Sequence, residues 1–135
     1  MVDYFNLDMP KDQLLTLSSL ALAHVGDAVY EVMVRSLLCR KGSYKMKDLH
    51  RATVRFVAAP AQAARMPLIE PVLSEEEADV FRRGRNTAPH SVPKAASRAE
   101  YQTATGLEAL FGWLYLQGRT DRLNELFSIL MAEDA

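Results

Sequence analysis

Residues 21–31 read Ala-Leu-Ala-His-Val-Gly-Asp-Ala-Val-Tyr-Glu, and residues 104–116 read Ala-Thr-Gly-Leu-Glu-Ala-Leu-Phe-Gly-Trp-Leu-Tyr-Leu. Each stretch predicts a largely apolar helix with one acidic residue, Asp27 or Glu108, close to glycine and other small residues. Charged side chains are almost never fully buried without a partner or a metal. The two acids therefore need a shared counter-charge, and a divalent cation is the simplest candidate.

The rest of the chain favours an all-α fold. It lacks sustained period-2 alternation, and alanine and leucine outnumber the β-branched residues that strands prefer. The predicted helices cover about 20–40, 47–66 with a new start at Pro60, 74–83, 98–117 and 120–131. Ser18 or Ser19 and Thr120 are the expected N-caps, and 74–77 form a capping box. Residues 84–97 are expected to form a basic loop.

Composition narrows the function classes. The 135 residues indicate one domain spanning 1–135, and 16 basic against 17 acidic side chains show no overall basic excess. The single Cys39 excludes an internal disulfide, and the three histidines have no zinc-ligand spacing. No signal pattern or membrane-length apolar run is present, so we expect a soluble, cytoplasmic protein with no membrane partner.

The positions of the acids suggest a chemistry. Asp27 and Glu31 lie one helical turn apart, and Glu108 is on a helix with small residues that allow close approach. If the two helices cross, the carboxylates converge into a site of hard oxygen ligands that suits Mg²⁺ or Mn²⁺. Such a metal can activate water for attack on a phosphodiester.

A structural interpretation stays open beside this one. Gly26 and Gly106 could be packing residues only, with each acid paired to an arginine such as Arg35 or Arg98. On spacing alone this alternative is favoured, because structural ion pairs outnumber metal sites.

The sequence Gly-Asp-Ala-Val-Tyr-Glu at 26–31, followed by residues 104–116, resembles the two hallmark helices of the ribonuclease III endonuclease domain. It is most similar to the mini-ribonuclease III subfamily, which lacks the double-stranded-RNA-binding domain that normally follows. The resemblance extends from about Leu17 to Met131 and includes residues 51–57 and 83–86. It implies a ribonuclease III-like helical bundle.

The resemblance assigns Asp27 and Glu108 to the two family carboxylates that hold the catalytic Mg²⁺, for which Mn²⁺ can substitute. Glu31 is a candidate third ligand, or it faces a basic residue across a dimer. Other family acid positions hold no acid here, which leaves the number of metals open; these positions are Leu20, Ala23 and Thr105.

The resemblance also implies a homodimer whose two domains form a valley for duplex RNA. The expected RNA contacts are Arg83, Arg85, Asn86 and Lys94, since duplex RNA is recognised through phosphates and 2′-hydroxyls. A second basic group fits a solvated helix face equally well; its members are Lys45, Lys47, Arg51 and Arg55. The dimer interface is expected around 26–34, with at least one of Val29, Val32 and Met33 facing the partner.

The implied function is a metal-dependent endoribonuclease that cuts double-stranded or structured RNA and leaves 5′-phosphate ends. Its implied substrate is the large-subunit ribosomal RNA precursor, and a ribosomal protein is an implied partner that shapes this substrate. The alternative is a catalytically inactive ribonuclease III-like RNA-binding or ribosome-associated structural protein. A His-Asp phosphohydrolase is excluded, because the chain contains no His-Asp dipeptide.

Overall fold

The computed structural model describes residues 1–42, 45–87 and 95–132, and all regular elements in these ranges are helices. The all-α prediction is confirmed. The α-helices are α1 (Lys11–Leu14), α2 (Ser19–Lys41), α3 (Met46–Val57), α4 (Ala59–Arg65), α5 (Glu75–Asn86), α6 (Arg98–Leu116) and α7 (Thr120–Leu130). Two short 3-10 helices, η1 (Met66–Leu68) and η2 (Glu70–Val72), join α4 to α5.

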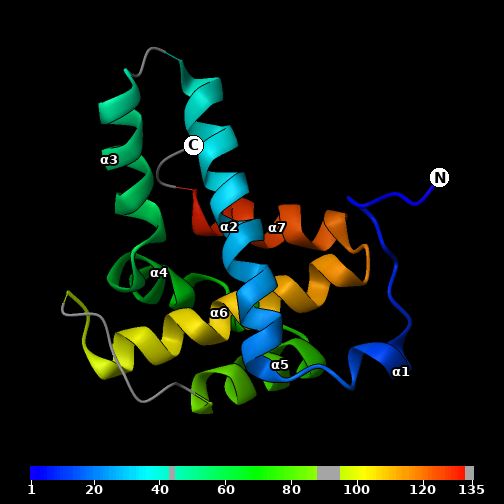
Figure 1. The fold of residues 1–135 in the computed structure, drawn as a ribbon. Coiled ribbons are helices and arrows are strands. Elements are labelled where there is room, and N and C mark those ends of the chain that lie inside the picture. Colours follow the sequence, from blue (N-terminus) through cyan, green and yellow to red (C-terminus); the bar gives the residue numbers. More distant parts are fainter. Residues whose placement is uncertain (43–44, 88–94, 133–135) are drawn as a thin grey trace.

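Helix α6 runs through the middle of the molecule, with α2 crossing it and α5 and α7 lying on either side (Figure 1). It contributes more side chains to the core than any other helix, because residues around the whole helix are buried. The fully buried ones are Leu107, Ala109, Leu110, Phe111 and Leu114. A helix that is apolar all round belongs inside a domain, which explains why the second motif lies at its centre.

Glycine brings α2 and α6 into direct backbone contact. A Cβ added to Gly26 would overlap the carbonyl oxygen of Glu108, and one added to Gly112 would overlap the carbonyl oxygen of Leu22. Only glycine permits this approach. The crossing of the two motif helices, expected from their small residues, is therefore observed, and it fixes Asp27 beside Glu108.

Most predicted helix ends agree with the structure. The Ser18 hydroxyl accepts a hydrogen bond from the amide of Ala21 at 3.0 Å, and Ser74 and Glu77 form the predicted capping box. Pro60 stands in the first turn of α4, as expected of a residue that starts a new helix. The prediction of Thr120 as an N-cap is wrong, since Thr120 is already helical and Arg119 precedes it without a side-chain cap.

The predicted loop over 84–97 begins too early. Helix α5 continues through Gly84 to Asn86. Gly84 stays helical because it packs on α6, where its added Cβ would stand only 2.8 Å from the Cβ of Ala109. This close packing compensates for the roughly 1 kcal/mol by which glycine disfavours a helix. Arg85 and Asn86 therefore lie on a helix.

A buried ion pair joins α5 to α7. Glu77 is 1% exposed, and its two carboxylate oxygens accept hydrogen bonds from Nε and Nη2 of Arg122, both at 2.8 Å. Arg122 also donates to the carbonyl oxygen of Val72 at 2.7 Å. The Glu77 carboxylate also accepts a hydrogen bond from the backbone amide of Ser74 at 2.8 Å. This one carboxylate therefore joins the N-terminal cap of α5 to helix α7.

The face of α2 expected to form a dimer interface is divided. Val29 is buried and Met33 is half-buried, whereas Val32 is 56% exposed. Val32 thus faces outward. Gly26 does not belong to that outer surface, because it is buried against α6. Within the described ranges, no helix is long and apolar enough to cross a membrane.

Candidate metal and RNA site

The structure brings Asp27 and Glu108 together. Asp27 is exposed and follows the glycine at the crossing, whereas Glu108 is half-buried one turn before the other crossing glycine. The two carboxyl groups are close enough that Asp27 raises the pKa of Glu108. The convergence expected from two glycine-bearing helices is therefore present.

Electrostatics in this pair disfavour two negative charges. The pKa of Glu108 is raised to about 8, first by burial and then by the charge of Asp27 and the hydrogen bond between the two carboxyl groups. A hydrogen bond from Gln62 acts in the opposite direction. Near neutral pH Glu108 therefore holds a proton that a cation could replace.

A cavity of about 170 Å³ opens beside the two acids. The positions where the resemblance places additional family acids line this same cavity, and Ala23 and Thr105 are both buried there. The Thr105 hydroxyl donates to the carbonyl oxygen of Tyr101 at 2.9 Å, within its own helix. The complete lining comprises Leu20, Ala23, His24, Asp27, Tyr101, Thr105 and Glu108.

Glu31 has a partner on its own helix. Its Oε1 accepts hydrogen bonds from Nη2 of Arg35 at 2.7 Å and from Nε at 3.2 Å. The charge of Glu31 nevertheless contributes to the raised pKa of Glu108, so it acts electrostatically on the acid pair. Arg35 therefore pairs with Glu31 and with neither member of that pair.

The carboxylates of Asp27 and Glu108 fit a hard divalent cation that needs few protein ligands. Among the described residues, neither Asp27 nor Glu108 forms an ion pair. No group of three or more His, Cys, Asp or Glu side chains in those same ranges is arranged to hold a metal. Mg²⁺ commonly takes one or two carboxylates and completes its shell with water and phosphate, so two acids suffice.

The predicted RNA contacts lie on the C-terminal half of α5. Arg83, Arg85 and Asn86 are exposed, while Lys94 lies outside the described residues. Arg83 forms an ion pair with Asp79 at 2.9 Å, and the guanidinium of Arg85 stands 5.5 Å from the centre of the Phe81 ring. This end of α5 packs on the segment of α6 that lines the acid cavity, since Gly84 approaches the Thr105 carbonyl.

The second basic group also has a structural setting. Lys45, Lys47, Arg51 and Arg55 are all exposed, and the last three recur at four-residue steps on α3. They form the solvated face of an amphipathic helix, so the structural interpretation of this group accounts for what is seen.

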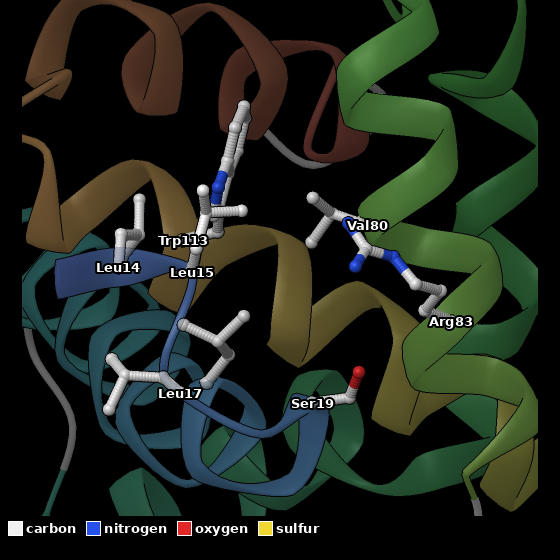
Figure 2. A pocket seen from close by; sticks show the side chains of 8 residues that line it. Leu14, Leu15, Leu17, Ser19, Val80, Arg83 and Trp113 are labelled. Carbon is white, nitrogen blue, oxygen red and sulfur yellow. The ribbon is translucent and has the colours of Figure 1, made fainter. Parts of the chain in front are cut away.

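A smaller cavity of about 40 Å³ lies among α1, α2, α5 and α6 (Figure 2). Leu14, Leu17, Val80 and Trp113 surround it, and Arg83 is the one ionisable side chain among the described residues that line it. No described residue lines it with a carboxylate, and Leu14 of α1 contributes to its apolar wall.

Sequence reasoning missed two polar side chains behind Glu108. Gln62 on α4 is 1% exposed, and its Nε2 donates to Oε2 of Glu108 at 3.4 Å. Tyr30 is fully buried, and its pKa is raised to about 12, mainly by burial, with the charge of Glu108 contributing. A lone amide in the alanine-rich segment 58–64 was the one available signal for Gln62.

Comparison with known proteins places this geometry in a family. The model of the Ribonuclease III domain matches residues 20–119, which include both acids and both crossing glycines. The chain belongs to the ribonuclease III family. The family prediction is therefore confirmed, and the chain is a ribonuclease III-type endoribonuclease.

Its relatives agree over most of their length. The chain is 51% identical to Mini-ribonuclease 3 of Symbiobacterium thermophilum over 83% of this chain and 86% of that one. It is 41% identical to Mini-ribonuclease 3 of Thermoanaerobacter sp., over 90% and 85% of the two chains. A crystal structure of a Fusobacterium nucleatum protein superposes with a TM-score of 0.79 at 27% identity, covering 87% and 90%.

Proposed function

We propose that this ribonuclease cuts double-stranded or structured RNA with a divalent metal held by Asp27 and Glu108, leaving 5′-phosphate ends. The observation that carries the proposal is the contact between these two carboxyl groups in an open cavity, with neither acid ion-paired among the described residues. Mg²⁺, with Mn²⁺ as a substitute, would supply an activated water and stabilise charge on the phosphate when bound. Glu31 remains a proposed third ligand.

The chain's own residues would do the rest. Asp27 and Glu108 bind the cation from two different helices, so the α2–α6 crossing sets their separation. Arg83, Arg85, Asn86 and Lys94 are proposed to contact RNA phosphates and riboses, because the described members are exposed on the helix that packs beside the acid cavity.

The proposal extends to assembly and substrate. Two antiparallel RNA strands match the symmetry of a two-fold dimer with one acid pair for each strand, so we propose a homodimer in the cytoplasm. The 56% exposure of Val32 on α2 supports an outward apolar contact. The large-subunit ribosomal RNA precursor, bound with a ribosomal protein, is the proposed natural substrate, as the resemblance to the mini-ribonuclease III subfamily implies.

One experiment tests catalysis and the metal together. The purified protein is incubated with a perfect RNA duplex and with folded ribosomal precursor, with Mg²⁺ or with a chelator, and the cut ends are mapped. Asp27→Asn and Glu108→Gln should abolish cutting but keep RNA binding, while Asp121→Asn and Glu70→Gln, at exposed positions away from the cavity, should cut normally. Tight RNA binding without any cleavage by the unaltered protein would favour the inactive RNA-binding alternative.

A further inference from the structure

Gln62 stands out among the buried polar side chains. The four that are buried within the described ranges are Thr53, Gln62, Glu77 and Thr105. Each threonine donates to a carbonyl oxygen one turn earlier in its own helix, and the glutamate is fully engaged by Arg122 and a helix cap. Gln62 alone makes its side-chain hydrogen bond to a carboxylate of the acid pair.

Fold stability does not explain an amide at this position. The Oε1 atom of Gln62 is buried and has no hydrogen-bond partner among the described residues, and the single bond from Nε2 is long at 3.4 Å. A buried amide with incomplete hydrogen bonding costs free energy, whereas an apolar side chain of similar size would gain it from the same burial.

The contact has a defined direction. Helix α4 packs against α6, so Gln62 reaches Glu108 from a different helix than Asp27, which lies on α2. By occupying Oε2 of Glu108, the amide restricts how the carboxylate can turn. A carboxylate held in this way presents its remaining lone pairs in a fixed orientation.

Tyr30 completes the polar environment behind Glu108. Its hydroxyl is buried and, like Oε1 of Gln62, lacks a hydrogen-bond partner within the described part of the chain. The aromatic rings of Phe111 and Phe127 lie against the tyrosine ring at 5.4 and 5.8 Å, which fixes its place. The buried side of Glu108 thus combines rigid packing with polar atoms, which is the arrangement that orients a metal ligand.

We propose that Gln62 is a positioning residue, whose side-chain amide holds the Glu108 carboxylate in the orientation that binds the divalent cation. The inference rests on the proposed function, because it requires Glu108 to be a ligand. Gln62 touches neither RNA nor metal in this scheme and acts only through Glu108. Loss of such an outer-shell partner commonly lowers metal affinity or activity about 10- to 100-fold.

The test replaces Gln62 with methionine, which keeps the side-chain length but removes the amide. Three quantities are measured: Mn²⁺ affinity of the RNA-free protein by calorimetry, thermal stability in chelator, and kcat and KM for duplex cleavage. We expect metal affinity and kcat to fall about 10- to 100-fold, with KM for RNA and thermal stability retained or improved. The matched control is Gln117→Met, which removes an amide that donates to the Trp113 carbonyl, away from the acids.

The outcomes separate the possible roles. If Gln62→Met lowers thermal stability while the folded protein binds Mn²⁺ and cuts like the unaltered enzyme, Gln62 is a structural residue and the proposal is overturned. Should the methionine variant fail to fold, Gln62→Ala takes its place, since alanine suits this alanine-rich helix, and the same criteria apply. If the unaltered protein binds no Mn²⁺, or Glu108→Gln binds it normally, the proposed function fails first and Gln62 has no ligand to position.

Discussion

Asp27 and Glu108 share a hydrogen bond between their carboxyl groups, although they lie on different helices. Carboxyl groups can form such a bond only when one of them keeps its proton. The raised pKa of Glu108, about 8, identifies this residue as the one that holds it. At neutral pH the Glu108 carboxyl group is therefore protonated, whereas an ordinary glutamate is ionised.

The first prediction is that stability without metal falls as pH rises. Between the ordinary pKa of 4.5 and the folded value of about 8, folded Glu108 keeps a proton that the unfolded chain has released. The free energy of unfolding therefore decreases across this window. Thermal unfolding in chelator at pH 5.5 and pH 8.5 measures the effect, and Glu108→Gln should remove this component. An identical pH slope in that variant would contradict the assignment.

The second prediction concerns the helix crossing. Gly26→Ala places a methyl group where the Glu108 carbonyl stands, so α2 and α6 must move apart. Overpacking of this kind typically costs about 1–3 kcal/mol, and backbone contact gives no flexible atom that can yield. We expect lower stability in urea and loss of cleavage in the folded fraction. Ser36→Ala, at an exposed site on α2, is the control and should change neither.

The third prediction separates stability from activity. Arg122→Met leaves Glu77 buried without its counter-charge, and breaking a buried pair costs on the order of 3–5 kcal/mol. Urea denaturation should show this loss, while the protein that remains folded should cut RNA at the normal rate. The double variant Glu77→Gln with Arg122→Met should recover part of the stability. Equal stability of the single variant and the unaltered protein would show that the pair contributes nothing.

A fourth prediction tests the RNA surface. Arg85→Ala, Asn86→Ala and Lys94→Ala should each weaken duplex binding without moving the cut. Each lost phosphate contact from a basic side chain should reduce the slope of log affinity against log salt by about one. Fluorescence anisotropy over a salt series measures both quantities, with Lys41→Ala at the far end of α2 as the control. Unchanged affinity in all three variants would return these residues to ordinary solvated surface.

The fifth prediction addresses assembly. Val32→Glu places a charge on the exposed apolar position of α2, and burying that charge in an interface is costly. We expect a folded monomer that has lost duplex cleavage, whereas Val72→Glu on η2 should stay dimeric. Sedimentation equilibrium at micromolar concentration reports the mass. A fully active monomer of the unaltered protein would refute both the dimer and the valley between its subunits.

The site was predictable where local sequence rules govern the structure. The glycines at 26 and 112 mark close approach, and the serine caps mark helix starts, so the helices and the meeting of the two acids could be predicted. The expectation that a glycine ends a helix was wrong at Gly84, which lies inside α5. Gly84 packs against Thr105, Gly106 and Ala109 of α6. The sequence around Gly84 gives no indication of this contact, because α6 is formed by a later part of the chain.

The groups behind Glu108 escaped prediction for a related reason. Gln62 and Tyr30 approach Glu108 from α4 and α2, and only tertiary packing shows that their polar atoms are buried. Local patterns cannot reveal whether an amide in a short helix faces solvent or a carboxylate. The short helices α1, η1 and η2 were missed as well, since a few residues give too little periodicity.

The contact of α2 with α6 through main-chain atoms at Gly26 and Gly112 has a consequence for how this enzyme can change over time. The distance between the two helices at the acids is set by the thickness of two bare backbones. Exchanges such as leucine for methionine elsewhere in the core alter volumes that the acid pair does not depend on. The interior can therefore drift in sequence while the spacing of the carboxylates stays constant, provided that two hydrogen atoms, the side chains of these glycines, are never replaced.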